Sequence, residues 1–300
     1  MNNKINFIKM QGLGNDFILI DKITEDIDLD SKHIKFLCNR KFGIGCDQLL
    51  IIEKSIDPLI NFNYKIFNQD GKEAQHCANG ARCVIKYLVK DKLISNDVIT
   101  LGTRNRIISG FVLANGDIKL SLGEPEFSAE KIPFIHKNNT NNKYSINIEN
   151  TNINLGIVSM GNPHAIICLN NKNELNNTDK LSKIARLLQQ SKYFPESVNI
   201  NFYYVKDKST IFLRTYERGC GFTLSCGTGA AATVCYAIKQ NEVEKETKVI
   251  MQGGVLTLIW ENKEVFMIGT AEEVYRGTID IKNINFGITE LSNFEERIFS

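Results

Sequence analysis

The sequence predicts two similar α/β domains, each containing a helix that begins at a cysteine. Three observations predict this fold class. The chain has 300 residues, more than one domain usually holds, and its hydrophobic fraction of 43% is enough for sizeable cores. The same order of expected strands and helices occurs twice along the chain. In each copy one helix follows a cysteine, Cys77 in the first and Cys226 in the second.

The first half of the chain reads as short strands interrupted by two helices. Strands are predicted by short β-rich runs that end in Gly, Asn or Asp, at 5–10, 16–21, 48–54 and 62–68. Apolar residues at helical spacing predict a helix within 30–45, which a Gly-rich stretch would end. The first cysteine-headed helix follows at 77–89. A meander of strands is then expected at 98–125, with Asn115-Gly116 as its hairpin signal.

The second half repeats this order after a boundary expected near Pro125. Residues 137–154 are rich in Asn, and we expect a solvated loop in the first half of this stretch and an edge strand in the second. Strands are expected within 155–160, 199–206, 209–217, 249–260 and 264–274, with an amphipathic helix at 179–191 and the second cysteine-headed helix at 226–238. The two halves share no close sequence identity, so the repeat is one of pattern.

Composition argues against several classes of protein. The net charge of +2 gives no electrostatic basis for binding nucleic acid or a membrane surface. The N-terminal residues lack the apolar core of a signal peptide, and no apolar run reaches transmembrane length, so we expect a cytoplasmic protein. The eight cysteines form no Cys-x-x-Cys, and only His76 of the four histidines adjoins a cysteine. We therefore expect free thiols and no metal site.

The two helix-leading cysteines are candidates for acid/base catalysis. The start of a helix has unpaired N–H groups and partial positive charge, which bind a carboxylate and lower the pKa of a thiol from its usual value of about 8.5. Gly80, Gly227 and Gly229 would let a ligand approach the backbone. Two such helix starts at one pocket would let one thiolate remove an α-proton while the other thiol donates from the opposite face. The competing interpretation is two ordinary buried cysteines, which we would favour for a single copy.

Ordered motifs carry a resemblance that covers nearly the whole chain. They run from KMQGLGNDF (9–17) through FGIGCDQLL, IFNQDGKE, CANGARC, SMGNPH, YERG, SCGTGAAA and QGGVLTLIW to GTAEEVYRG (269–277). In these motifs the chain resembles the diaminopimelate epimerase family, enzymes with two catalytic cysteines and no cofactor. The resemblance implies an α+β fold of two pseudo-symmetric domains, each a curved, mostly antiparallel sheet wrapped around its central helix. We expect one domain at 1–123 plus about 270–300, and the other at 124–269.

The resemblance also implies roles for individual residues. Cys77 and Cys226 would be the acid/base thiols, and His164 and Glu217 would lie near them and help to set their protonation. The backbone around Ala78–Asn79 and Gly227–Thr228 would hold the reacting amino-acid centre. The remaining substrate contacts would come from Asn15, Gln48, Asn68, Asn162, Asn199, Glu217 and Arg218. Arg gives a bidentate donor for a distal carboxylate, and Asn gives uncharged acceptors for an ammonium group.

The leading interpretation is an epimerase that interconverts LL- and meso-diaminopimelate, for lysine and peptidoglycan precursors, with no cofactor and as a homodimer. Three departures from the family pattern bear on substrate choice: Ala78 replaces a usual Gly, Cys46 a usual Phe, and Phe222 a usual acid. Ala78 and Phe222 leave open a racemase of another amino acid, which Arg218 and the set of Asn residues disfavour. A non-catalytic amino-acid-binding paralogue is disfavoured because both thiols are present, and a redox or metal protein built on His76 lacks ligand spacing.

Overall fold

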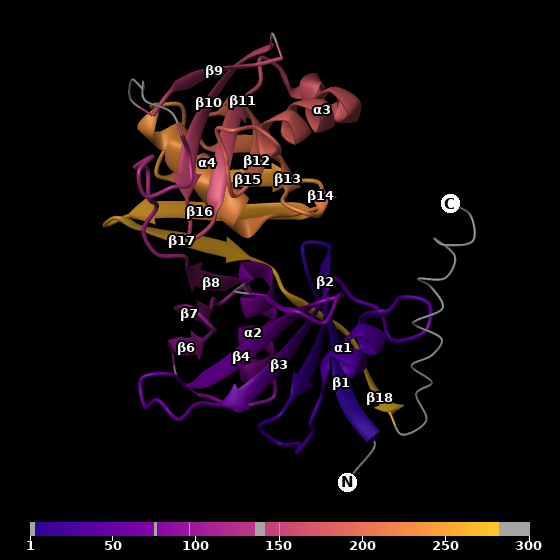
Figure 1. Ribbon diagram of the computed structural model, residues 1–300. Helices are drawn as coiled ribbons and strands as arrows, with labels where there is room; N and C mark the ends of the chain where they lie inside the picture. Colours follow the sequence, from indigo (N-terminus) through magenta and orange to yellow (C-terminus); the bar gives the residue numbers. More distant parts are fainter. Residues whose placement is uncertain (1–3, 75–76, 96, 136–141, 150, 282–300) are drawn as a thin grey trace, which may run out of the picture. The chain divides into compact units, whose positions relative to one another are not determined.

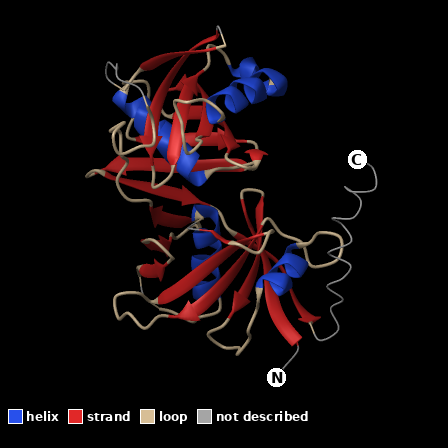
Figure 2. Cartoon of the chain, in the orientation of Figure 1, coloured by secondary structure: helices blue, strands red, loops and turns tan. Residues whose placement is uncertain are grey.

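The computed structural model describes residues 4–74, 77–95, 97–135, 142–149 and 151–281. The contacts divide the chain into two compact units, one of residues up to Ile118 together with those from Thr270, and the other of Lys119–Gly269. Both units are rich in strands and contain few helices (Figures 1 and 2). This composition is that of the predicted α+β class.

The described part of the first unit is a mixed sheet with two helices. Its elements are β1 (Lys4–Gly12), β2 (Asn15–Asp21), α1 (Ser31–Cys38), β3 (Gln48–Lys54), β4 (Phe62–Asn68), β5 (Glu73–Ala74), α2 (Ala78–Lys90), β6 (Ile99–Gly102), β7 (Ile107–Val112) and β18 (Glu272–Asp280). Neighbouring strands pair antiparallel, except that β2 pairs parallel with β3 and β4 pairs parallel with β6. Parallel neighbours need a crossover connection, and α1 and α2 lie in these two crossovers.

The second unit follows the same plan. Its elements are β8 (Ile118–Ser121), β9 (Tyr144–Ile148), β10 (Thr151–Ser159), β11 (Pro163–Cys168), the 3₁₀ helix η1 (Lys172–Asn176), α3 (Thr178–Gln189), β12 (Asn199–Asp207), β13 (Thr210–Glu217), β14 (Gly221–Phe222), α4 (Gly227–Lys239), β15 (Glu246–Met251), β16 (Gly254–Glu261) and β17 (Glu264–Gly269). Its parallel pairs are β11 with β12 and β13 with β15, joined through α3 and α4. Strand pairing thus gives α4 the same position in its sheet that α2 has in the first unit.

The helices α2 and α4 are enclosed by their own sheets. Each is 13 residues long, and most of its first ten residues are buried irrespective of which face of the helix they occupy. In the second unit α4 contacts β10, β11, β12, β15, β16 and β17, and in the first unit α2 contacts β1, β2, β7 and β18. A helix that is buried on all sides belongs at the centre of a fold. Each sheet is therefore wrapped around the helix that a cysteine precedes.

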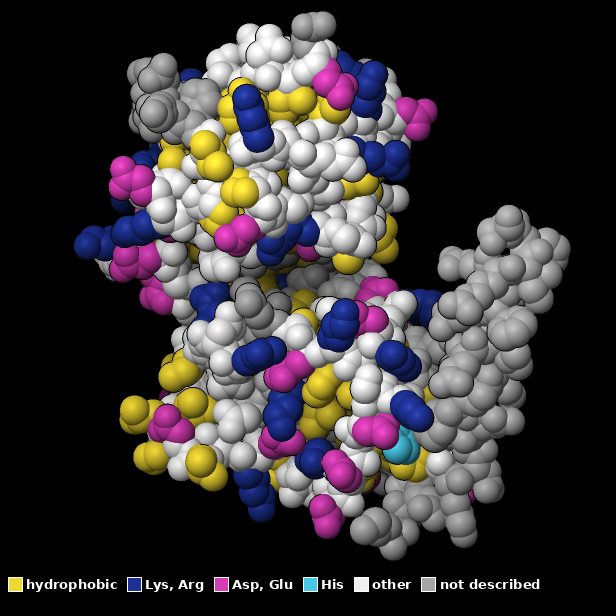
Figure 3. Space-filling view, viewed as in Figure 1, with side chains coloured by type: hydrophobic (Ala, Val, Ile, Leu, Met, Phe, Trp, Pro, Cys, Tyr) yellow, Lys and Arg dark blue, Asp and Glu magenta, His cyan; other side chains and the backbone are white. Residues whose placement is uncertain are grey.

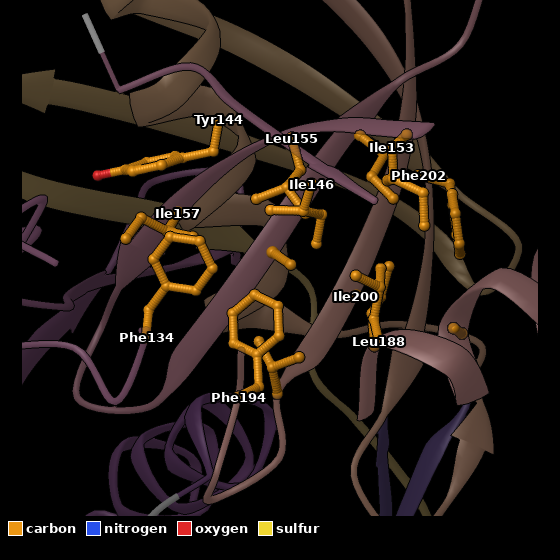
Figure 4. Close-up of a cluster of buried hydrophobic side chains, with 14 of the residues drawn as sticks. Phe134, Tyr144, Ile146, Ile153, Leu155, Ile157, Leu188, Phe194, Ile200 and Phe202 are labelled. Atoms are coloured by element: carbon orange, nitrogen blue, oxygen red, sulfur yellow. The ribbon is translucent and has the colours of Figure 1, made fainter. Parts of the chain in front are cut away.

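The other two helices cover the opposite face of each sheet. In the first unit Ile34 and Leu37 of α1 pack with Ile18, Ile20 and other buried residues of the strands. In the second unit Leu188 of α3 lies in a cluster with Phe194 and residues of β9 to β12 (Figure 4). Strands covered on both faces read as continuous apolar runs, and QLLIIEK of β3 is such a run.

The described part of the chain differs from the sequence-based expectation in several elements. Strand β11 was not predicted, because Pro163 and the Gly-Asn pair before it indicate a loop; a proline is tolerated as the first residue of a strand. Strand β10 begins at Thr151 rather than 155, since pairing with β9 outweighs the low strand propensity of its Asn residues. The expected strand at 264–274 is interrupted between β17 and β18. The expected loop at 137–141 and the tail beyond 281 lie outside the described residues.

Gly156 shows how closely α4 packs on its sheet. A Cβ atom added at Gly156 of β10 would lie 2.0 Å from Cε2 of Tyr236, a residue of α4. We expect Gly156→Ala to lower the free energy of unfolding by about 1–3 kcal/mol or more, because the ring must move within a packed core. Urea denaturation measures this change, and Asn154→Ala on an exposed position of the same strand is the control. Equal effects of the two substitutions would contradict the packing argument.

Candidate active site

Both helix-leading cysteines have the same local geometry. Cys77 is the N-cap of α2 with φ −144° and ψ 114°, and Cys226 is the N-cap of α4 with φ −131° and ψ 109°. In each case the cysteine carbonyl accepts a 2.9 Å hydrogen bond from the N–H four residues later, that of Ala81 or Ala230. The predicted helix starts are therefore correct. Each unit carries one thiol at the mouth of its central helix.

The Cys77 thiol lies among polar groups of the first unit. Its Sγ accepts a hydrogen bond from the N–H of Gly80 at 3.5 Å and lies 3.7 Å from Oδ1 of Asn15, to which it can donate. Nδ2 of Asn79 donates to the same Asn15 oxygen at 3.4 Å. Cys77 is half-buried, whereas Asn79 is buried. The structure thus brings together three of the residues that the sequence singled out.

Charged groups behind this cluster hold it in place. Arg82 is fully buried, and it donates to Asn79 Oδ1 at 3.0 Å and to the Thr270 carbonyl at 3.0 Å. Asp47 accepts from Nδ2 of Asn15 at 3.0 Å and from Arg40 at 2.8 Å. These contacts fix the amides beside Cys77 before any ligand binds.

Asp16, the neighbour of Asn15, forms ion pairs with Lys9 and Arg40. Burial would raise the pKa of Asp16, but hydrogen bonds from Arg40 and Lys9 outweigh it and lower that pKa to about 2.

Gln48 and Asn68 lie opposite each other on β3 and β4, and Nε2 of Gln48 donates to Oδ1 of Asn68 at 2.9 Å. Both of these expected substrate residues are therefore at the ends of paired strands.

The Cys226 thiol has a different electrostatic environment. Burial raises the pKa of Cys226 well above its usual value, and the negative charge of Glu217 raises it further. Hydrogen bonds from Gly229 N–H and Thr228 act in the opposite direction without outweighing burial. The lowering of the pKa expected at a helix start is therefore overcome at Cys226. Burial also raises the pKa of Glu217, whose Oε1 accepts from the Thr223 hydroxyl at 2.6 Å.

His164 reaches Cys226 through two side chains. Its Nε2 lies 3.1 Å from Oδ1 of Asn162, whose Nδ2 donates to Oγ1 of Thr228 at 3.3 Å. Oγ1 of Thr228 lies 3.6 Å from Sγ of Cys226. On its other side, Nδ1 of His164 accepts from Nδ2 of Asn201 at 3.0 Å. Asn162, expected at the distal end of a substrate, is thus engaged between the histidine and the helix start.

Sequence analysis did not single out Asn201 or its partner Thr215. Both are buried polar residues on strands whose other buried positions are apolar except for Asn199 and Thr210. A polar side chain at a buried strand position is the signal that could have found them, since buried polar groups require partners.

The expected distal residues Asn199 and Arg218 also contact each other. Oδ1 of Asn199 accepts from the backbone N–H of Arg218 at 3.0 Å, and its Nδ2 donates to the Pro163 carbonyl at 3.3 Å. The guanidinium of Arg218 is exposed and donates to the Glu196 carbonyl at 2.9 Å. Asn199 therefore positions the backbone that carries Arg218.

The glycines of the two helix starts face protein. A Cβ at Gly80 would lie 3.1 Å from Cδ2 of Leu50, and one at Gly229 would lie 2.5 Å from Oδ1 of Asn201. These two glycines let the first helical turn pack closely against its sheet.

The three departures from the family pattern have different surroundings. Phe222 packs edge-on against Tyr216, with ring centroids 5.1 Å apart, and the Arg214 guanidinium lies 4.0 Å above its ring. Cys46 is fully buried with its Sγ 3.4 Å from that of Cys38. Ala78 is the first residue of α2 and is also buried. Phe222, at which the resemblance leads us to expect an acid, therefore makes packing contacts.

Replacing Glu217 by glutamine is expected to lower the pKa of Cys226. The substitution removes the negative charge that raises this pKa, so alkylation of Cys226 by iodoacetamide should reach its half-maximal rate at a lower pH. Peptide mapping by mass spectrometry measures this rate. Glu242→Gln is the control, because Glu242 contacts the Tyr203 hydroxyl instead. An unchanged alkylation profile in Glu217→Gln would refute the proposed influence of this carboxylate.

The described residues contain no cluster of three or more His, Cys, Asp or Glu side chains arranged to hold a metal ion. Among the same residues, no helix combines the length and apolarity that crossing a bilayer requires. On the surface drawn in Figure 3, Lys and Arg side chains lie among Asp and Glu side chains. This mixed surface gives no support to a nucleic-acid partner.

Comparisons with known proteins identify relatives along most of the chain. Residues 7–128 and 156–274 match the family described as diaminopimelate epimerase. The chain is 38% identical over 282 residues to the diaminopimelate epimerase of Thioalkalivibrio sulfidiphilus, covering 93% of this chain and 100% of that protein. It is 39% identical over 280 residues to that of Nitrosomonas europaea, with the same coverage.

Solved structures show the same fold at much lower identity. A hydroxyproline epimerase from Agrobacterium vitis, with bound trans-4-hydroxy-L-proline, superposes with a TM-score of 0.69 at 12% identity over 95% of both chains. A probable proline racemase from Agrobacterium radiobacter superposes with a TM-score of 0.67 at 12% identity over 94% of both chains.

Proposed function

Because the chain belongs to the diaminopimelate epimerase family, we propose that it interconverts LL- and meso-2,6-diaminopimelate without a cofactor. The observation that carries this proposal is the repeated unit: in both halves a cysteine caps a 13-residue central helix. The proposed mechanism requires one of these thiols to act on each face of the substrate α-carbon.

The reaction is a proton transfer across that carbon. With LL substrate, the thiolate of Cys77 removes the α-proton from one face, and the thiol of Cys226 gives its own proton to the other face. The pair of electrons left on carbon spreads into the α-carboxylate, which the N–H groups at the two helix starts stabilise. Each turnover leaves the proton on the opposite thiol, which is the form that the reverse direction requires.

The two thiol environments support this division of roles. The N–H of Gly80 donates a hydrogen bond to Sγ of Cys77 that a thiolate would accept. Burial and Glu217 favour the protonated form of Cys226. In this proposal the forward reaction starts with the proton on Cys226, which acts as the acid.

The remaining residues bind the substrate in this proposal. Asn15, Asn79 and the backbone of Ala78, Gly227 and Thr228 surround the reacting centre. Arg218 binds the distal carboxylate, and Gln48 and Asn68 contribute to the same pocket. Asn162 and Asn199 form hydrogen bonds within the second unit, and in the proposal they position the groups beside this pocket. As part of the proposal we assign the enzyme to the cytoplasm. We also propose that it is a homodimer, and analytical ultracentrifugation tests this oligomeric state.

Isotope exchange tests the reaction. The reduced protein is incubated with LL-diaminopimelate in heavy water, and the α-hydrogen is followed by NMR together with the ratio of stereoisomers. We expect deuterium to enter with inversion. Exchange only with another amino acid, such as proline, would indicate a racemase, and exchange with neither would indicate a binding protein.

Arg218→Lys tests the distal contact. We expect kcat/KM for diaminopimelate to fall about 10²-fold, mainly through KM, because lysine keeps the charge but loses the bidentate geometry. Steady-state kinetics measure this change. Arg186→Lys, on the exposed face of α3, is the matched control. Equal kinetics in the two variants would remove Arg218 from the binding site.

A further inference from the structure

A chain of hydrogen bonds inside the second unit ends at the sulfur of Cys226. It begins at Thr215 on β13, whose hydroxyl donates to Oδ1 of Asn201 on β12 at 2.9 Å. It continues from Nδ2 of Asn201 to Nδ1 of His164 at 3.0 Å, and then through Asn162 and Thr228 to the thiol, as described above. Three strands, the turn before β11 and the start of α4 are thereby connected to one reacting atom.

The direction of this chain follows from the chemistry of its members. An amide nitrogen only donates, so the Nδ1 atom that accepts from Asn201 carries no proton. A neutral imidazole then carries its proton on Nε2, which donates to Oδ1 of Asn162. The amide nitrogen of Asn162 donates to the Thr228 oxygen, and the Thr228 hydroxyl, 3.6 Å from Sγ, can then donate to Cys226. Every donor points toward the sulfur.

Thr215 lies at the origin of this chain and donates to the Asn201 oxygen. A threonine hydroxyl can donate or accept a hydrogen bond. The Asn201 amide can turn either its oxygen or its nitrogen toward His164. The bond from Thr215 holds the Asn201 oxygen on one side and thereby turns the nitrogen toward the imidazole. His164, Asn201 and Thr215 are all buried, with exposed fractions of 0%, 0% and 3%, so water does not compete for these contacts.

We propose that Asn201 and Thr215 are positioning residues that fix His164 as the neutral Nε2–H tautomer and so direct the Thr228 hydroxyl at Cys226. In this role the histidine donates along the chain and does not take the thiol proton itself. The donated hydrogen bond stabilises the thiolate form of a deeply buried cysteine, which must exist for Cys226 to act as a base. The bearing on catalysis rests on the proposed function, whereas the tautomer and the thiol pKa are measurable without substrate.

Gly229 supports the same assignment. A Cβ at this position would lie 2.5 Å from Oδ1 of Asn201, 2.9 Å from Oγ1 of Thr215 and 3.2 Å from Sγ of Cys226. The start of α4 is thus packed directly onto the origin and the end of the hydrogen-bond chain.

The tautomer is measured by nitrogen NMR on protein labelled with ¹⁵N-histidine. The chain has four histidines, and the His164→Gln variant assigns the signal. In the wild-type protein at neutral pH we expect Nε2 protonated and Nδ1 unprotonated. In Asn201→Asp the carboxylate can only accept, so the proton should move to Nδ1. A wild-type His164 with a proton on Nδ1, or a tautomer unchanged in Asn201→Asp, would overturn the proposal.

The thiol is measured by the pH dependence of Cys226 alkylation. In Asn201→Leu and Thr215→Val we expect the apparent pKa of Cys226 to rise by about one unit, a tenfold loss of thiolate at a given pH. Glu217 on β13 is the charged group that acts on Cys226, and it is retained in both variants; the facing residues Asn199 of β12 and Gly227 to Ala230 of α4 are uncharged.

Thr247→Val is the matched control for Thr215→Val. Thr247 is a fully buried strand threonine whose hydroxyl donates to the Glu244 carbonyl, outside the hydrogen-bond chain. We expect it to leave the Cys226 alkylation profile unchanged. Equal profiles in Thr215→Val and Thr247→Val would show that Thr215 has only a structural role. Should Asn201→Leu fail to fold, Thr215→Val and the wild-type tautomer still decide the question.

Discussion

Cys77→Ala and Cys226→Ala are each expected to lower kcat/KM for epimerisation by about 10³- to 10⁴-fold, the upper range for loss of a general acid or base. Either substitution leaves one face of the α-carbon without a proton donor or acceptor. The assay is inversion of LL-diaminopimelate, followed by the ratio of stereoisomers. This is the largest effect that the proposed mechanism predicts.

The two helices provide their own controls for this experiment. Cys83 in α2 and Cys235 in α4 are fully buried cysteines that lie within the helices rather than at their starts. Cys83→Ala and Cys235→Ala should reduce stability modestly and leave the kinetics close to wild type. If either helix-start variant kept wild-type activity, the two-thiol mechanism would be wrong.

Mild oxidation is expected to abolish activity completely and reversibly. Hydrogen peroxide would convert the Cys77 and Cys226 thiols to one disulfide with release of two molecules of water, which leaves neither base nor acid. Dithiothreitol should restore activity. Activity is followed during titration with peroxide, and non-reducing peptide mapping identifies the sulfur atoms that are joined.

Oxidation of a second pair of thiols must be distinguished from oxidation of Cys77 and Cys226. Cys38 and Cys46 have sulfur atoms 3.4 Å apart in the first unit, although their hydrogen bond and burial raise the pKa of Cys46 and slow its reaction. In Cys46→Ala we expect the same reversible loss of activity. Retained activity in oxidised Cys46→Ala, or in wild-type protein whose Cys77 and Cys226 are demonstrably joined, would contradict the prediction.

The sequence predicts the central elements of the fold well, for a physical reason. The strands at 48–54 and 62–68 and the helices headed by Cys77 and Cys226 each combine a strong apolar period with clear turn residues at their ends. Strand β11 escaped prediction because its signals conflict: Pro163 indicates a loop, and pairing with β10 and β12 decides otherwise. Local strand propensity does not determine which distant segments pair.

Sequence motifs likewise predict some features of the candidate site and not others. Motifs identified Cys77, Cys226 and His164, and the structure shows the surroundings of each. They could not show that Asn162 is engaged between His164 and Thr228, because that depends on which strands become neighbours. Nor could a helix start alone give the pKa of Cys226, since burial acts in the opposite direction there and outweighs it.

The return of β18 to pair with β1 sets an order for folding during synthesis. Residues 119–269 are contiguous and hold the described strands of the second unit apart from the first residue of β8, so this unit can fold as soon as the ribosome has released it. The first unit has to wait for its last strand, and Arg82 of α2 meets its carbonyl partner only when Thr270 emerges. A nascent chain that stops near residue 260 would therefore carry a folded second half and an unpaired β1 edge, open to aggregation.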